Sequence, residues 1–238
     1  MLSGAVCMSD APVLTLEWGT SYRIIPTLFP ERTLFDEVCS EDELEYVYYI
    51  ESLTNKRIAD EIGDTSKVPK DEWVLGKGST PIMAAFTHVK ASRFNTDYFG
   101  AYYASKELKT AIYETVYHRE RFYSDNKAPA GHYHMRVYNA RIKGSSFYDI
   151  QDQKVYEKYY NPESYLDCQK LGTQAKKQSR DGIIYKSIRY TSGTNVAVLR
   201  PKAIIPPVKI HKILSYYWDG EKISMVNDLG KGRNLLIN

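Results

Sequence analysis

Residues 91–114, ASRFNTDYFGAYYASKELKTAIYE, contain the change of pattern that decides the fold. An Arg-Phe-Asn turn at 93–95 leads into an aromatic strand at 102–104, and the strand leads into a helix. The helix carries Glu114. This stretch therefore brings an arginine, two tyrosines and a carboxylate into one region of the chain.

The helix after the strand is predicted over residues 105–122. Ser105 is the expected N-cap, because its hydroxyl can accept a hydrogen bond from a free amide of the first turn. Apolar and small side chains recur at three- and four-residue spacing and predict a buried stripe. The stripe consists of Leu108, Ala111, Ile112 and Thr115. Glu114 falls at its edge, where packing can hold a carboxylate that faces a cleft.

Alternation of apolar and polar residues predicts further strands on both sides of this stretch. They cover residues 12–18, 131–143, 183–190, 195–200 and 203–214. Pro206 and Pro207 predict that the last of these is an edge strand, because proline donates no ladder hydrogen bond. A helix is also predicted over residues 41–62, with Gly63 as its C-cap. Strands late in the chain and helices earlier indicate a single α+β domain.

The composition is that of a globular chain with a tyrosine excess. The 238 residues are enough for one domain with a substantial core. There are 21 tyrosines and 7 phenylalanines. Tyrosine side chains suit surfaces that are partly exposed to water and sites that bind flat rings. The net charge of +3 is too small to predict nucleic-acid binding, and it is compatible with an anionic small molecule.

Several features concern the compartment in which the chain acts. No apolar run approaches the roughly 18 residues that cross a membrane, so no membrane partner is expected. Residues 1–12 lack the basic and apolar regions of a signal peptide, and either Met1 or Met8 can be the native start. The expected site of action is the cytoplasm, while delivery as an injected effector remains open. Cys7, Cys39 and Cys168 have no metal-like spacing and predict reduced thiols.

Two segments resemble ligand motifs without completing them. Residues 76–80, GKGST, lack the first glycine of the phosphate-binding loop pattern and a strand before it, so a plain surface loop is predicted. His132 and His134 share one strand face, as in half of a metal site. No third ligand lies at a useful spacing, so no metal is expected. His118, one helical turn after Glu114, is near enough to reach the same cleft.

The residue types around 91–114 suit the cleavage of NAD. A guanidinium can hold a pyrophosphate with two hydrogen bonds, and the flat cationic nicotinamide ring can stack on tyrosine. Breaking the nicotinamide–ribose bond develops positive charge on the ribose, which one nearby carboxylate can stabilise. This chemistry requires no metal, no nucleophilic cysteine and no Ser-His-Asp triad.

An ordered set of short motifs adds a resemblance to a known family. The motifs are Tyr22-Arg23-Ile24, Arg93-Phe94-Asn95, Tyr103 eleven residues before Glu114, DCQKLG at 167–172, GIIYKS at 182–187 and NVAVLRP at 195–201. In this order, over residues 20–210, they resemble the RES family, bacterial NAD-consuming toxins named for an arginine, a glutamate and a serine. Two features depart from compact family members. Arg23 lies 70 residues before Arg93, and the sequence around Ser187 varies within the family.

The resemblance implies a fold, a reaction and a set of site residues. The implied fold is related to ADP-ribosyltransferase toxins, with a central mixed sheet and flanking helices. Arg93, helped by Arg23, would bind the NAD phosphates, and Tyr103 would contact the nicotinamide end. Glu114 would act at the ribose, and Ser187 would orient the cofactor or the glutamate.

The resemblance also implies partners. NAD is the expected substrate, degraded by hydrolysis or phosphorolysis. Family members are neutralised by an antitoxin with an Xre-like helical DNA-binding part. Another immunity protein in that role, and a homodimer, remain open. Direct binding of nucleic acid is not expected.

On this interpretation, residues 1–19 form an N-terminal extension and first strand, residues 20–215 the catalytic domain with a helical insertion at 31–80, and residues 216–238 its C-terminal tail. The main prediction is a toxin that cleaves NAD as a glycohydrolase or phosphorylase. An ADP-ribosyltransferase that modifies a protein would use the same site with another acceptor. A non-enzymatic module that stacks nucleic-acid bases on its tyrosines is the alternative from another class, and the low net charge disfavours it.

Overall fold

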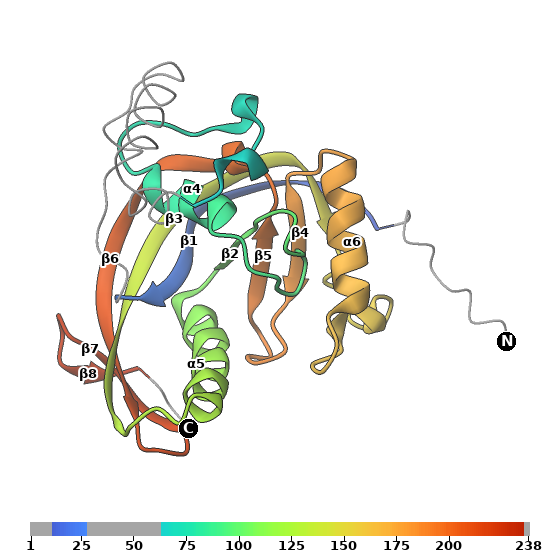
Figure 1. Ribbon diagram of the computed structural model, residues 1–238. Coiled ribbons are helices and arrows are strands. Elements are labelled where there is room, and N and C mark those ends of the chain that lie inside the picture. Colours follow the sequence, from blue (N-terminus) through green and yellow to red (C-terminus); the bar gives the residue numbers. More distant parts are fainter. Residues whose placement is uncertain (1–10, 28–62, 236–238) are drawn as a thin grey trace, which may run out of the picture.

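The strands form one mixed sheet of eight strands in the computed structural model, which describes residues 11–27 and 63–235. The order is β1-β2-β5-β4-β3-β6-β7-β8 (Figure 1). The α+β prediction is confirmed, because helices pack on this sheet within a single domain. The strands are β1 (Val13–Pro26), β2 (Tyr102–Ser105), β3 (Gly131–Asp149), β4 (Gly182–Lys186), β5 (Thr194–Val198), β6 (Ile204–Trp218), β7 (Ile223–Asp228) and β8 (Arg233–Asn234).

The sheet partly closes on itself, because β1 pairs with both β2 and β3. The long β3 runs antiparallel to β1 and β6, and its last residues run parallel to β4. The contact between β1 and β2 is a single register pair, Tyr22 with Ser105. Beside this pair, the side chain of Arg23 reaches the backbone carbonyl of Tyr103, with 3.2 Å between Nη1 and the oxygen. A guanidinium therefore links the two strands where their backbones no longer pair.

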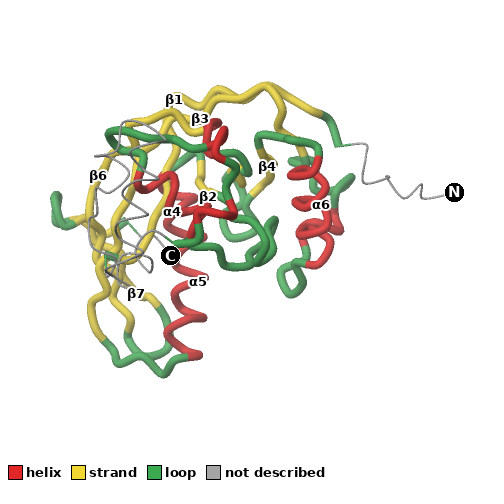
Figure 2. Tube along the Cα trace, turned by 45° about the horizontal axis from the view of Figure 1, so that its top comes forward, coloured by secondary structure: helices red, strands yellow, loops and turns green. Residues whose placement is uncertain are grey.

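Helices α4, α5 and α6 lie within the curve of the strands, as Figure 2 shows. They are α4 (Thr80–Thr87), α5 (Leu108–Asp125) and α6 (Leu166–Lys177), with short 3-10 turns η1 (Thr65–Lys67), η2 (Lys70–Glu72), η3 (Glu157–Tyr160) and η4 (Pro201–Ala203). The buried face of α5 includes Ala111, Ile112 and Val116, which pack in one cluster with Met135 and Leu214 of the sheet. Burial of this face fixes the rotation of α5 and so the direction of Glu114.

The predicted helix start at Ser105 is wrong. Ser105 is the last residue of β2, where it pairs with Asn195 of β5, and α5 begins at Leu108. The N-cap of α5 is Glu107, whose side chain makes no capping hydrogen bond. The hydroxyl of Ser105 donates instead to the side chain of Asn195, at 2.6 Å. Strand pairing outweighs the capping preference here, because the serine side chain finds a buried acceptor across the sheet.

The prediction of an edge strand at 203–214 is also wrong. β6 lies between β3 and β7 in the sheet. The prolines are nevertheless compatible with this position, because β7 pairs with β6 only from Leu214 onward. The ladder with β3 also changes register between its pairs at Ile205 and Lys209, on either side of the two prolines. Proline is accommodated where its missing donor leaves no gap in a ladder.

The strand predicted at 183–190 ends at Lys186, and α4, α6, β7 and β8 are additions to the predicted elements. The predicted helix at 41–62 lies outside the described residues, and Gly63 has the positive φ of 75° that suits a C-cap glycine. β1 includes residues 19 and 20, between which the N-terminal extension was expected to end and the catalytic domain to begin. The expected domain boundaries stay predictions. No helix among the described residues is long and apolar enough to span a membrane.

Candidate active site

Glu114 is held by two side chains, that of Ser187, which follows β4, and that of Asn195 in β5. Its Oε1 accepts hydrogen bonds from Oγ of Ser187 and from Nδ2 of Asn195, both at 2.7 Å. The amide oxygen of Asn195 accepts from Ser105 at 2.6 Å, so the chain of bonds continues into β2. We call Ser105, Glu114, Ser187 and Asn195 the glutamate cluster. The side chains of Ser105, Ser187 and Asn195 are each less than 5% exposed. Water therefore has little access to the hydrogen bonds that hold the carboxylate in place.

The two oxygens of the Glu114 carboxylate have different surroundings. Both donors of the cluster bind Oε1. Among the residues that the structure describes, none donates a hydrogen bond to Oε2. A carboxylate held by one oxygen keeps its charge and orientation while the other oxygen can accept a hydroxyl from a ligand. Glu114 is half-buried, so a ligand can approach it.

Ser187 links the glutamate to the loop between β4 and β5. Its Oγ donates to Glu114 and accepts from the backbone amides of Arg189 and Tyr190, at 3.1 and 2.9 Å. One hydroxyl thus ends β4, shapes the turn and anchors the carboxylate. The structure brings Ser187 and Glu114 into direct contact, although 73 residues separate them in the chain.

Arg93 is held by backbone oxygens and aromatic rings. Its Nη1 donates to the carbonyl of Tyr159 at 3.2 Å and approaches that of Asn161 at 3.5 Å. Its guanidinium carbon lies 4.5 Å from the ring centroid of Tyr165. We call residues 92–95, with Arg93 at their centre, the arginine turn. No hydrogen bond or ion pair joins Arg93 to Glu114 in the described part of the chain.

Tyr103 fixes the arginine turn. Its hydroxyl accepts a hydrogen bond from the amide of Phe94 at 2.8 Å and donates one to Oδ1 of Asn95 at 2.9 Å. Burial raises the pKa of Tyr103 far above its usual value, so the hydroxyl stays protonated and can do both. The structure therefore places Tyr103 beside the turn that carries Arg93, and Arg23 on the carbonyl of the same tyrosine.

Helix α6 supports the arginine turn from the other side. The side-chain amide of Gln169 donates to the carbonyl of Ser92 at 3.0 Å. A Cβ atom at Gly172 would lie 1.7 Å from the carbonyl oxygen of Phe94, so only glycine allows this approach. The DCQKLG motif thus packs against the RFN motif, and both motifs are needed to place Arg93.

Tyr185 joins the two halves of the site and was not among the predicted site residues. Burial, and then the negative charge of Glu114, raise the pKa of Tyr185 well above its usual value. Tyr103 also raises this pKa electrostatically, and Arg93 lowers it. The ring packs on Phe94 with 4.9 Å between centroids. A signal for Tyr185 existed, because it precedes Ser187 by two residues in the same motif.

His132 and His134 are not part of a metal-binding group in the described residues. No group of three or more His, Cys, Asp or Glu side chains is arranged to hold a metal ion within residues 11–27 and 63–235. His132 bonds Ser215 at 3.0 Å instead. His118 does lie near the site, since Glu114 raises its pKa electrostatically. Partial burial of the ring is the larger influence, and together with Arg189, Arg93 and Arg119 it leaves the pKa lowered.

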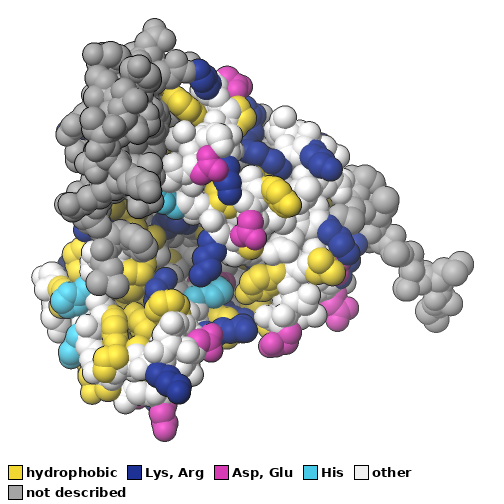
Figure 3. All heavy atoms as spheres, in the orientation of Figure 1, with side chains coloured by type: hydrophobic (Ala, Val, Ile, Leu, Met, Phe, Trp, Pro, Cys, Tyr) yellow, Lys and Arg dark blue, Asp and Glu magenta, His cyan; other side chains and the backbone are white. Residues whose placement is uncertain are grey.

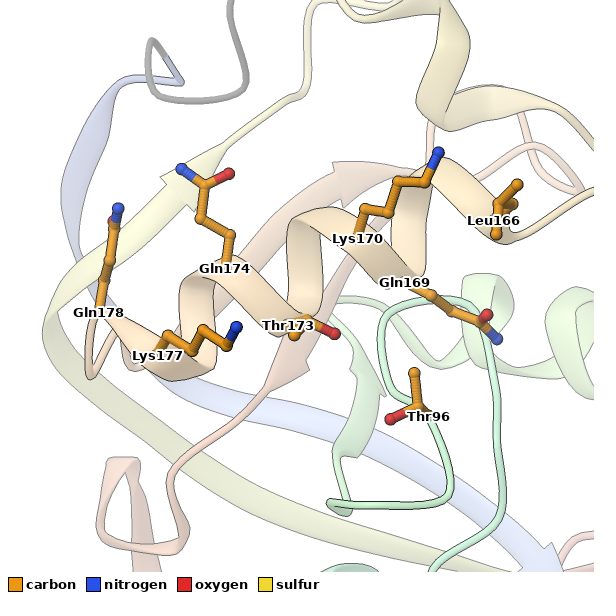
Figure 4. A pocket seen from close by; sticks show the side chains of 8 residues that line it. All are labelled: Thr96, Leu166, Gln169, Lys170, Thr173, Gln174, Lys177 and Gln178. Carbon is orange, nitrogen blue, oxygen red and sulfur yellow. The ribbon is translucent and has the colours of Figure 1, made fainter.

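A separate cavity of about 540 Å³ lies on the outer face of α6 (Figure 4). Its lining has two lysines and no carboxylate. The lining residues are Thr96, Leu166, Gln169, Lys170, Thr173, Gln174, Lys177 and Gln178. None of them belongs to the glutamate cluster. The chemistry described above requires a fixed carboxylate, so we place the candidate active site at Glu114 and not in this cavity.

The structure is thus an α+β domain in which Glu114 is anchored by hydrogen bonds and the arginine turn is packed by Tyr103 and Tyr165. Comparison with known families identifies a RES domain at residues 68–219, which is more than half of the chain. The chain belongs to the RES family, as its motifs indicate.

Two individual proteins are also similar. The uncharacterized protein y4oC of Sinorhizobium fredii (strain NBRC 101917 / NGR234) is 27% identical over 209 residues, covering 86% of this chain and 85% of the relative. A chain in the crystal structure of the M. tuberculosis MbcT-MbcA toxin-antitoxin complex matches with a TM-score of 0.44 and 11% identity. That match covers 86% of this chain and 87% of the other.

Proposed function

We propose that this protein cleaves the bond between nicotinamide and ribose in NAD, with Glu114 as the catalytic carboxylate. The observation that carries the proposal is the anchoring of Glu114 through one oxygen by Ser187 and Asn195. Membership of the RES family supports the choice of NAD. The neighbouring tyrosines and arginines supply the groups that a cationic ring and a pyrophosphate require.

In the proposed reaction, the bond between C1′ of the ribose and the nicotinamide nitrogen breaks. The electron pair leaves with nicotinamide, which becomes neutral, and positive charge develops on the ribose. The carboxylate of Glu114 stabilises this charge, and its Oε2 is available to accept a ribose hydroxyl. The oxygen of a water or phosphate then forms a bond to C1′, and a proton is released when water is the acceptor. The products are nicotinamide and ADP-ribose or its 1-phosphate.

The other predicted residues take supporting roles in this proposal. Ser187 orients the glutamate and not the cofactor, because its hydroxyl already donates to Glu114. Tyr103 positions the arginine turn through its hydroxyl. Arg93 would bind the phosphates of NAD through the donors other than Nη1, which already bonds the carbonyl of Tyr159. Arg23 would lie next to the same phosphates.

Proton NMR of NAD mixed with the full chain, with and without inorganic phosphate, tests the proposal. We expect free nicotinamide to appear, and the second product to identify the acceptor. The Glu114→Gln variant keeps an oxygen that can accept from Ser187 but removes the charge, so it should release little nicotinamide. Glu120→Gln on the same helix is the matched control, because Glu120 bonds the amide of Ile223 outside the site.

Other outcomes would assign a different function. NAD left intact by the wild-type protein, alone and with a cell extract, would contradict NAD cleavage. Transfer of radiolabel from NAD onto a protein in the extract would instead establish an ADP-ribosyltransferase. Salt-sensitive retention on single-stranded DNA, unchanged in Glu114→Gln, would support the binding module.

We further propose that the activity makes the protein a toxin acting in the cytoplasm, neutralised by an antitoxin as in the RES family. Expression in bacteria should then lower cellular NAD and stop growth, and Glu114→Gln should relieve both. A gene product that restores growth and binds the purified chain would identify the neutralising partner. Normal NAD levels in arrested cells would separate toxicity from NAD cleavage.

A further inference from the structure

The loop between β4 and β5 holds an arginine against α5. The guanidinium carbon of Arg189 lies 3.3 Å from the ring centroid of Tyr117. The next residue, Tyr190, stacks on Tyr113 with 5.2 Å between centroids and 17° between the rings. Since Ser187 also bonds both loop amides, the position of Arg189 is fixed at the backbone and at the side chain.

The guanidinium of Arg189 has unused hydrogen-bond donors. Its Nη2 is buried, and within the described ranges no group accepts a hydrogen bond from it. Arg200, by contrast, is paired with Glu72 and Asp181. A buried donor without an acceptor costs free energy, and a buried cation without an anion costs more. This arginine is therefore prepared for an anionic ligand.

Arg189 lies beside the glutamate cluster. The hydroxyl of Ser187 touches both the amide of Arg189 and the carboxylate of Glu114. Arg189 and Glu114 also act on the same side chain, His118, with opposite effects on its pKa. On the face shown in Figure 3, Lys and Arg side chains gather around the centre next to a histidine. Arg189 and Glu114, the proposed catalytic carboxylate, are thus linked through the hydroxyl of Ser187.

We propose that Arg189 binds a phosphate group of the reactants at this site. The inference rests on the proposed function and adds a ligand contact to it. The phosphate group belongs either to the pyrophosphate of the dinucleotide or to inorganic phosphate acting as the acceptor. Stacking on Tyr117 holds one face of the planar guanidinium, which leaves its edge for two parallel hydrogen bonds to phosphate oxygens. A lysine at this position would supply charge without that geometry.

Steady-state kinetics of Arg189→Gln and Arg189→Lys test the inference. In phosphate-free buffer, a contact to the pyrophosphate should raise the KM for NAD by about tenfold or more in Arg189→Gln, and less in Arg189→Lys. A contact to inorganic phosphate should leave that KM unchanged and abolish the increase in rate on adding phosphate. Arg119→Gln is the matched control, because Arg119 also lies over a ring of α5, that of Phe122, at 5.3 Å.

A measurement independent of catalysis accompanies the kinetics. ADP should raise the melting temperature of wild-type protein and of Glu114→Gln, and raise it less in Arg189→Gln if the pyrophosphate is the ligand. Inorganic phosphate is the corresponding probe for the acceptor. If neither KM, phosphate response nor these shifts differ between Arg189→Gln and the control, the inference is wrong. Wild-type protein that leaves NAD intact would refute the proposed function, and the melting shifts would still decide the role of Arg189.

Discussion

The glutamate cluster and the arginine turn are two parts of the candidate site, and they are built differently. Side chains hold the glutamate, since Ser187 and Asn195 bond one carboxylate oxygen and leave the other without a donor among the described residues. Backbone carbonyls and packed rings hold Arg93. A group held by few side-chain bonds can keep part of its bonding capacity for a ligand. A group such as Arg93, whose donors already bond backbone carbonyls, has fewer donors left for a ligand.

Because of this difference, we expect substitutions in the two parts of the site to affect different quantities, the reaction rate in one and the free energy of unfolding in the other. Changes at the glutamate cluster should lower the rate of reaction and leave the fold intact. Changes at the arginine turn should lower the free energy of unfolding as well, because α6, β2 and η3 meet there. Four experiments test this difference between the two parts of the site.

Glu114→Gln should give the largest effect. Loss of the charge should reduce kcat by about 100- to 1000-fold, as loss of a preorganised electrostatic contact does elsewhere. The free energy of unfolding should change by less than about 1 kcal/mol, because the glutamine oxygen can still accept from Ser187. Nicotinamide release and thermal unfolding measure the two quantities. A protein that unfolds with this substitution would show that the cluster is structural.

Gly172→Ala should act on the arginine turn alone. The new Cβ would lie 1.7 Å from the carbonyl oxygen of Phe94, so α6 has to move away. We expect a loss of about 1–3 kcal/mol in the free energy of unfolding, typical of overpacking. Denaturant titration against Thr173→Ala, a neighbour on the same helix, isolates the close approach. Equal stability of the two variants would mean that α6 does not fix the turn.

Asn195→Ala should produce a smaller effect, on the rate. It removes one of the two donors to Glu114, so the carboxylate loses orientation but keeps its charge. We expect kcat to fall by about tenfold, the equivalent of one lost hydrogen bond, while the KM for NAD stays unchanged. Ser105→Ala, one bond further away, should lower kcat less. A reversed order of the two variants would contradict the proposed chain of hydrogen bonds.

The elements of the fold that could be predicted were those with a clear period. α5 was predicted from its apolar stripe, and its start was missed by three residues because Ser105 pairs with β5. α6 gave no such signal, because its buried face is formed by Cys168, Leu171, Gly172 and Ala175. Glycine lowers helix propensity, yet this glycine is required by the contact with Phe94. A local pattern cannot show a constraint that comes from another part of the chain.

The same limit explains what could be predicted of the site. Glu114, Ser187, Arg93, Tyr103 and Arg23 could be chosen from the motifs and the family resemblance. The resemblance left open whether Ser187 orients the glutamate or the cofactor. Asn195 begins the NVAVLRP motif, but no local pattern links it to its partner Glu114, which is 81 residues away. Arg189 was also missed, because an unpaired arginine is recognisable only when its surroundings are known. The structure supplies these pairings.

The smallest expected effect is a loss of stability at alkaline pH, caused by Tyr102 beside Arg23. Burial raises the pKa of Tyr102, which lies under the guanidinium of Arg23, to about 12. Below pH 10 the tyrosine is protonated in both the folded and unfolded states, so stability does not change. Between pH 10 and about 12 the unfolded state loses the proton first, so stability falls as pH rises. For this group alone we expect a loss of about 1 kcal/mol by pH 11.

Denaturant titrations of wild type and Tyr102→Phe at pH 8 and pH 11 measure this loss. The Tyr102 hydroxyl is buried and has no hydrogen-bond partner among the described residues, so its removal should cost little at pH 8. The variant should then lose less stability than the wild type at pH 11. Equal losses in the two proteins would place the sensitive group elsewhere. A smaller loss in the variant would show that the arginine side of the site depends on neutral tyrosine, whereas the glutamate cluster depends on a fixed charge.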